Sequence, residues 1–207
     1  MAITINPLPM TNAAGTFAIT LDGLIQGFAM DDPSSRNWLV GGVLASTETL
    51  PLWGGVPITD QISDPTVTNY SLGNNVLRAT SQATTTGWAV FNQNYAAVNT
   101  PQSPVPLLQN GMLVNFYRNI SNARIVVAMD PALVSSLTGS QVEPTALYWD
   151  VTNYRITATT TGGNFALPTS YSLVGYNSGN SMIVSYASGT GFATWNRTGS
   201  AAILQLS

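Results

Sequence analysis

Carboxylates are the side chains of this sequence that could carry acid–base chemistry, since nine Asp and Glu residues occur among 207. Two carboxylates facing each other across a groove could hydrolyse a glycosidic bond. Their spacing singles out no such pair. Asp31–Asp32 precedes Pro33, as at a turn or helix start, and Asp130 precedes Pro131, as a helix cap. A carboxylate-dependent glycan hydrolase is therefore the least favoured function.

Several residue types that enzymes and cofactor sites use are missing. The chain has no Cys and no His, and its six basic residues are all Arg. This excludes a Cys nucleophile, imidazole and thiolate ligands, and a catalytic lysine. Asp60 and Asp64 could contact calcium, but the twelve-residue calcium loop is absent from the sequence. We therefore expect a non-enzymatic protein without metal or cofactor.

The charge content is unusually low. Charged residues make up 7% of the chain, against about 25% in ordinary soluble domains. A nearly uncharged surface tends to associate, which favours a subunit covered in an assembly. The alternative is a stable protein from a secreted or viral background whose composition has drifted toward Thr, Ser, Asn and Gly.

Charge and hydropathy also bear on partners and location. The formal net charge of −3 leaves no basic patch for phosphates, so we expect no direct nucleic-acid binding. The N-terminal segment "MAITINPLPM" lacks the features of a secretory signal, and apolar runs such as 125–129 are too short to span a membrane. We expect synthesis in the cytoplasm and no membrane association.

Strand patterns dominate the elements that would position any site. Residues 154–160 alternate with a period of two, and Asp22–Gly23 is a tight-hairpin signal. These patterns predict a single all-β domain over 1–207, an antiparallel barrel or sandwich with long loops. The predicted strands are 15–23, 24–30, 87–93, 112–118, 123–129, 146–150, 154–160, 171–177, 181–187, 192–196 and 201–206.

One short helix is predicted at about 130–138. Asp130 suits its N-cap, Pro131 its first position and Gly139 its C-terminal end. Leu133, Val134 and Leu137 would form its buried face.

Long loops are predicted where proline interrupts the strand patterns, at 46–72 and 94–110. The Pro-rich loop at 99–110 contains three prolines within six positions. They favour an extended, polyproline-like segment that could dock along a neighbour with little loss of conformational entropy. An ordinary crossover loop between sheets is the alternative. Residues 1–14 would form an N-terminal arm.

The five tryptophans could include a sugar-binding platform. Trp88 and Trp149 stand inside strand patterns and are expected in the core. Trp53 and Trp195 are the two candidates for exposure.

Several blocks of the sequence resemble a family of head-associated structural proteins of tailed bacteriophages, the capsid cement or decoration proteins. They are "DDPSSRNWLVGGVLASTETLPLWGGVPI" (31–58), "FNQ" (91–93), "NTPQSPVPLLQNGMLVNFYRNISNARIVVAMDPAL" (99–133) and "YWDVTNYRI" (148–156). The resemblance covers roughly residues 30–157 and does not extend to the last fifty.

This resemblance implies a virion protein that is assembled in the bacterial host cytoplasm and binds the major capsid protein. It would bridge neighbouring capsid subunits, as a homo-oligomer for which a trimer is one arrangement. It implies no catalytic residue. The alternative is a carbohydrate- or receptor-binding β module on a head fibre or tail. The residues expected at the interface are Trp53, Pro101, Pro104, Val105, Pro106, Leu107 and Leu108.

Overall fold

The computed structural model describes residues 23–30, 38–62, 74–91, 98–100, 103–137 and 146–207. The predicted N-terminal arm (1–14) and nearly all of the predicted strand at 15–23 lie outside these residues. So do Asp31–Asp32, Asp64 and Gly139.

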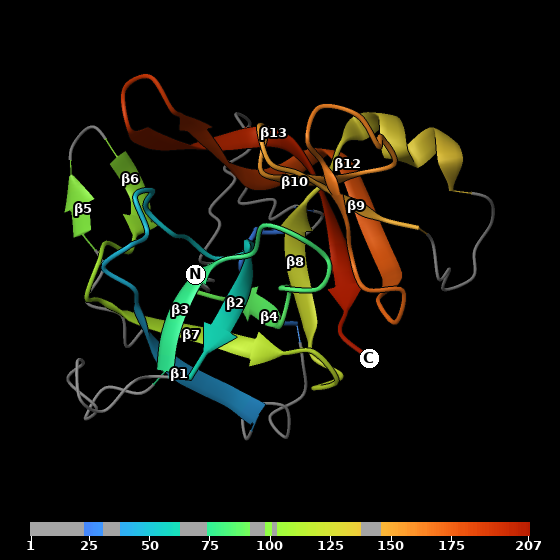
Figure 1. Cartoon of the computed structure of the whole chain (residues 1–207). Coiled ribbons are helices and arrows are strands. Elements are labelled where there is room, and N and C mark those ends of the chain that lie inside the picture. Colours follow the sequence, from blue (N-terminus) through green and yellow to red (C-terminus); the bar gives the residue numbers. More distant parts are fainter. Residues whose placement is uncertain (1–22, 31–37, 63–73, 92–97, 101–102, 138–145) are drawn as a thin grey trace, which may run out of the picture.

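The prediction of an all-β fold is confirmed, and its centre is a closed five-stranded barrel (Figure 1). The barrel strands follow the order β1-β3-β2-β4-β7. Strand β1 pairs in parallel with β3, whereas the other ladders of the barrel are antiparallel, so the barrel is mixed and not wholly antiparallel as predicted. The bounds are β1 (Leu39–Leu44), β2 (Pro57–Gln61), β3 (Asn74–Arg78), β4 (Gly87–Ala89) and β7 (Leu113–Arg118).

A glycine lets the barrel close tightly. Gly42 of β1 faces Val76 and Phe116, two fully buried side chains. A Cβ atom on Gly42 would lie 2.6 Å from a Val76 methyl carbon and 3.3 Å from the Phe116 ring. The missing side chain therefore makes room for these two neighbours.

Two three-stranded sheets accompany the barrel. One has the order β12-β13-β8 and the other β10-β9-β11. Their bounds are β8 (Arg124–Ala128), β9 (Tyr148–Asp150), β10 (Arg155–Thr157), β11 (Phe165–Ala166), β12 (Ser172–Ala187) and β13 (Phe192–Gln205). The buried hydrophobic residues of the barrel and of both sheets form one cluster. Within it Trp88 packs edge-on against Trp149 at 5.4 Å, which confirms the prediction that both are core residues.

The prediction of four separate strands between 171 and 206 is wrong, because β12 and β13 are two long strands. The turn-like residues after Asn177 form an irregular step in the ladder instead of a turn. Gly179 takes a φ of 77°, and its N–H donates to the Ser200 hydroxyl at 3.1 Å. The extra residues are thus absorbed as a bulge. Residues 24–30 contribute single bridges at Ile25 and Ala29 and no strand.

The predicted helix is present in a tighter form, as the 3-10 helix η3 (Pro131–Ser136). The Asp130 carboxylate caps it by accepting a hydrogen bond from the Ala132 N–H at 3.1 Å. Leu133 is buried as expected, whereas Val134 and Leu137 are half-buried. The helix ends at Ser136 because Leu137 is already extended.

The Pro-rich segment is not an extended arm or loop. It folds into a hairpin of β5 (Val98–Thr100) and β6 (Ser103–Leu107), and β6 packs against β13. The two prolines of β6 occupy alternate positions, so their missing N–H groups fall on one edge of the strand. A two-stranded sheet can leave that edge unpaired. In the described ranges, no helix has the length and hydropathy of a membrane span.

Candidate functional site

The residues predicted at the interface are mostly inside the protein. Val105, Leu107 and Leu108 are buried, and Leu108 forms a β-bridge with Leu52. Trp53, one of the two candidates for exposure, is completely buried. Pro106 is half-buried. Pro101 lies outside the described residues, and Pro104 is described only by its place in β6. The buried members of this group have no surface to offer a partner.

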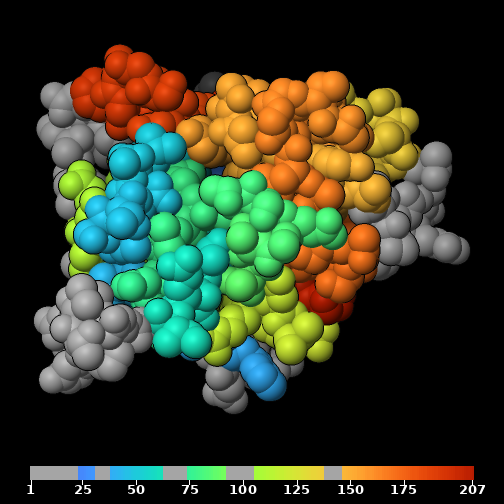
Figure 2. All heavy atoms as spheres, in the orientation of Figure 1, coloured from blue at the N-terminus to red at the C-terminus, as the bar shows by residue number. Residues whose placement is uncertain are grey.

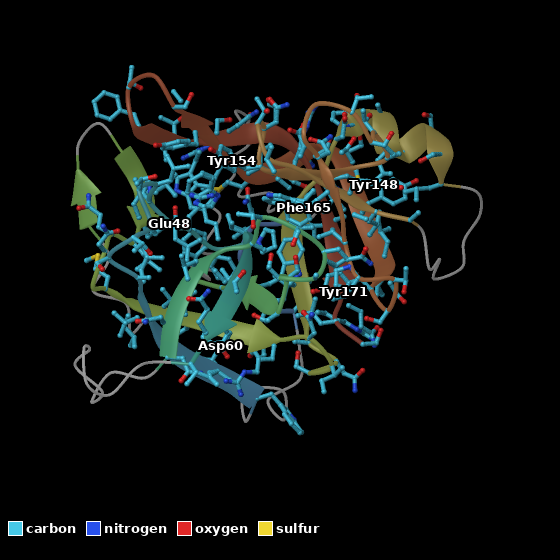
Figure 3. All side chains as sticks on the ribbon, in the orientation of Figure 1. Glu48, Asp60, Tyr148, Tyr154, Phe165 and Tyr171 are labelled. Atoms are coloured by element: carbon cyan, nitrogen blue, oxygen red, sulfur yellow. The ribbon has the colours of Figure 1, made fainter. Side chains whose placement is uncertain are left out.

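Trp53 points inward because it completes an aromatic cluster with Tyr154 and Tyr186. Its ring centre lies 5.1 Å from each of theirs. The Arg78 guanidinium lies over the Trp53 ring at 4.6 Å and the Tyr154 ring at 5.1 Å. It also donates to the Pro51 carbonyl, while the Arg78 N–H donates to the Glu48 carboxylate at 2.9 Å. Figure 3 shows Glu48 and Tyr154 on the same side of the molecule.

This cluster has a structural role. Burial lowers the pKa of Arg78, and the Tyr154 and Glu48 side chains oppose that shift. The guanidinium is held by ring faces and a carbonyl and fastens the segment before β2 to β3.

The carboxylates among the described residues also have structural roles. Arg155 contacts Asp130 at 3.3 Å and Asp150 at 3.6 Å. Burial would raise the pKa of Asp150, but hydrogen bonds from Asn153 and Thr152 and the charge of Arg155 together hold it below its usual value. Among the described residues, no group of three acidic side chains gathers where it could bind a metal.

An apolar patch lies at one end of β7. Its two most exposed members are Trp38, 63% exposed, and Ile120, 81% exposed. They border a shallow cleft of about 320 Å³. We call it the Trp38–Ile120 patch, formed by Trp38, Val40, Arg118, Asn119, Ile120 and Ser121.

Ile120 is held in an unfavourable backbone conformation. It has a φ of 64° in a turn closed by the Ser121 N–H donating to the Arg118 carbonyl at 3.3 Å. Glycine or asparagine normally occupies such a position, and a β-branched residue there is an outlier. Neighbouring contacts impose it: the Asn119 N–H donates to the Thr86 carbonyl at 2.8 Å, and Tyr171 donates its hydroxyl proton to the Asn119 side chain. Strain of this kind is typical of functional positions.

The charge beside this patch is neutralised. The Arg118 guanidinium donates to one Asp60 carboxylate oxygen at 2.8 and 2.6 Å, and the other oxygen accepts from the Asn74 amide at 2.9 Å. Asp60 lies at this end of the barrel (Figure 3). The patch thus presents apolar groups beside a satisfied ion pair.

The sequence prediction missed Trp38 and Ile120. Trp38 lies within the block quoted for the resemblance, and Ile120 is the single apolar residue in "RNISN" (118–122). An isolated isoleucine among turn-forming residues is the signal that could have located the patch.

We expect Ile120→Asn to raise the free energy of unfolding by about 1 kcal/mol, because Asn tolerates the left-handed conformation. Little burial is lost, since Ile120 is mostly exposed. Urea denaturation would measure the change. Ile62→Asn is the matched control, because Ile62 is 93% exposed without a positive φ. An equal gain in both variants, or none in Ile120→Asn, would contradict the strain.

Comparison with known proteins identifies no relative: no protein-family model, curated protein or solved structure matches this chain.

Proposed function

We propose that this protein is a non-enzymatic structural component of a bacteriophage virion. It binds the outer surface of the capsid as a cement or decoration protein and bridges neighbouring major capsid subunits. The sequence resemblance over residues 30–157 and the low charge content support this proposal.

The observation that carries the proposal is the exposure of Trp38 beside a strained Ile120. Holding an isoleucine in a left-handed turn costs stability through backbone strain. The turn leaves its apolar side chain exposed, and contact with a partner would bury that side chain favourably. Tryptophan is also among the residues that most often dominate binding energy at protein interfaces.

The size of the Trp38–Ile120 patch suits a partner that presents many identical binding sites. Burying each large apolar side chain contributes about 1.5–3 kcal/mol, and ordering the partners offsets part of it. A single contact would therefore be weak. A protein that forms oligomers and binds a lattice of identical sites gains avidity from the number of contacts. The homo-oligomer and its trimeric form remain predictions.

The test of this function is the copy number of the protein in purified virus particles, measured by quantitative mass spectrometry against the major capsid protein. Hundreds of copies per particle would support a cement protein. A dozen or fewer would place it in the portal, tail or a fibre, and absence from the particle would refute the proposal.

Attachment to the capsid should resist salt. The Trp38–Ile120 patch is apolar, and its arginine is already paired with Asp60. Raising NaCl from 0.05 to 1 M should therefore change the bound fraction by less than about twofold, because salt screens charges and strengthens apolar burial little. Sedimentation of particles followed by gel densitometry measures the bound fraction. Release of most of the protein at molar salt would show that ion pairs hold it.

A further inference from the structure

A second cleft lies at the opposite end of β7 from the Trp38–Ile120 patch. The tip of the β12–β13 hairpin, the turn after β6 and the segment before β2 surround it. Figure 2 shows the red hairpin tip beside the cyan segment that precedes β2. The volume of this Tyr186 cleft is about 440 Å³, within the range of about 300–1,000 Å³ for small-molecule sites. It is lined by Thr49, Leu50, Pro51, Leu107, Gln109, Asn110, Tyr186 and Gly191.

The lining combines polar and apolar side chains and carries no charge. Thr49 and Gln109 are exposed, and within the described residues neither side chain has a hydrogen-bond partner. The same is true of the Tyr186 hydroxyl. The Asn110 amide donates to the Ser46 carbonyl at 3.3 Å. Hydroxyl and amide groups are thus left to pair with a ligand that has both donors and acceptors.

Glu48 and Arg78, two charged residues that hydrogen-bond to the lining residues Leu50 and Pro51, are already engaged within the protein. The Glu48 carboxylate accepts the N–H groups of Leu50 and Arg78, and the Arg78 guanidinium lies over aromatic rings. A strongly anionic or cationic ligand would find no counter-charge on the lining. This argues for a neutral ligand.

Two neighbouring aromatic rings fix the orientation of the Tyr186 ring. Trp53 lies 5.1 Å from it, tilted by 38°, and Tyr154 lies 5.7 Å away, edge-on. Burial and Tyr154 raise the pKa of Tyr186, against the opposing effect of Arg78, so its hydroxyl stays a neutral donor. An aromatic ring with fixed orientation binds an apolar ligand face at low entropic cost.

We infer that the Tyr186 cleft binds a short neutral saccharide. A sugar ring presents apolar C–H groups on one face and hydroxyls around its edge. Those C–H groups match Tyr186 and Pro51, and the hydroxyls match Thr49, Gln109 and Asn110. The sequence had suggested Trp53 or Trp195 for such a role. Trp53 instead supports the ring that lines the cleft, and half-buried Trp195 packs on Phe91 at 5.7 Å.

The probe for this site is a panel of neutral oligosaccharides built from glucose, galactose, mannose or N-acetylglucosamine. Sialylated and sulfated glycans serve as charged comparisons. Saturation-transfer NMR on the full chain would identify binders, and calorimetry would measure their affinity. We expect saturable binding of at least one neutral saccharide and weaker binding of the charged glycans.

Variants then locate the site. Tyr186→Ala should weaken binding about tenfold or more, since an aromatic contact contributes about 1.4 kcal/mol. Gln109→Ala should weaken it severalfold without affecting the fold, because Gln109 is exposed. Phe192→Ser is the matched control, since Phe192 is 45% exposed near the same hairpin tip and does not line the cleft.

Three outcomes would overturn the inference: binding of none of the neutral saccharides, unchanged affinity in both Tyr186→Ala and Gln109→Ala, or preference for the charged glycans. This test of saccharide binding is independent of the proposed binding to the capsid. Trp38→Ala, which alters the Trp38–Ile120 patch, should leave saccharide binding unchanged. Loss of binding in Trp38→Ala as well would also contradict the assignment to this cleft.

Discussion

Replacing Gly87 with alanine is expected to destabilise the protein by about 3 kcal/mol or more, the upper end of the usual cost of overpacking. A Cβ atom there would lie 2.3 Å from the Tyr117 carbonyl oxygen and 3.1 Å from the Arg118 Cα atom. Both atoms belong to the backbone of β7, so no side-chain rotation can relieve the clash. Strand β4 cannot shift either, because it also pairs with β2 through Pro57 and Ile58. Urea denaturation would measure the loss.

Gly189→Ala is the matched control. Nothing lies within 4 Å of its added Cβ atom, and Gly189 has no positive φ. Its free energy of unfolding should stay within about 0.5 kcal/mol of the parent protein. If Gly87→Ala is as stable as Gly189→Ala, β4 and β7 do not pack as closely as the structure shows.

The strands that could be predicted are those whose pattern is local. Residues 112–118, 123–129 and 154–160 alternate or carry β-branched runs, and each contains a strand of the structure. Trp88 and Trp149 could be assigned to the core because they stand within such patterns.

The strands that escaped prediction depend on distant partners. Strand β1 contains two glycines and pairs with β3 and β7, which lie far along the chain. The prolines of β6 argue against a strand locally, but β6 packs against β13, which is distant in sequence, and Val105 of β6 is buried. The closed barrel depends on the pairing of β1 with β3 and β7, and no short window of sequence contains these partners.

The candidate sites were hidden for a related reason. Trp53 and Tyr186 are both aromatic, and the sequence does not say which one faces solvent. Trp53 is buried beneath the Arg78 guanidinium, and Tyr186 lines the cleft. The strain at Ile120 arises because Asn119 is hydrogen-bonded to Thr86, just before β4, and to Tyr171, and these partners are distant in sequence.

Replacing Trp38 with alanine should reduce attachment to capsids about thirtyfold or more, since truncating an aromatic anchor at an interface costs about 2 kcal/mol or more. The stability of the free protein should hardly change, because 63% of Trp38 is already exposed. Binding of purified protein to undecorated particles measures the effect. Tyr176→Ala is the control, since Tyr176 is 47% exposed on β12, outside the patch.

Ile120→Asn is a second test of capsid binding by the Trp38–Ile120 patch. It should weaken attachment to the capsid while stabilising the free protein. A residue with a purely structural role cannot give that pair of opposite signs, since removing it would lower stability. An isoleucine kept for binding gives both signs, because the strain belongs to the free protein and the apolar contact belongs to the complex. Normal attachment of both Trp38→Ala and Ile120→Asn would show that another surface contacts the capsid.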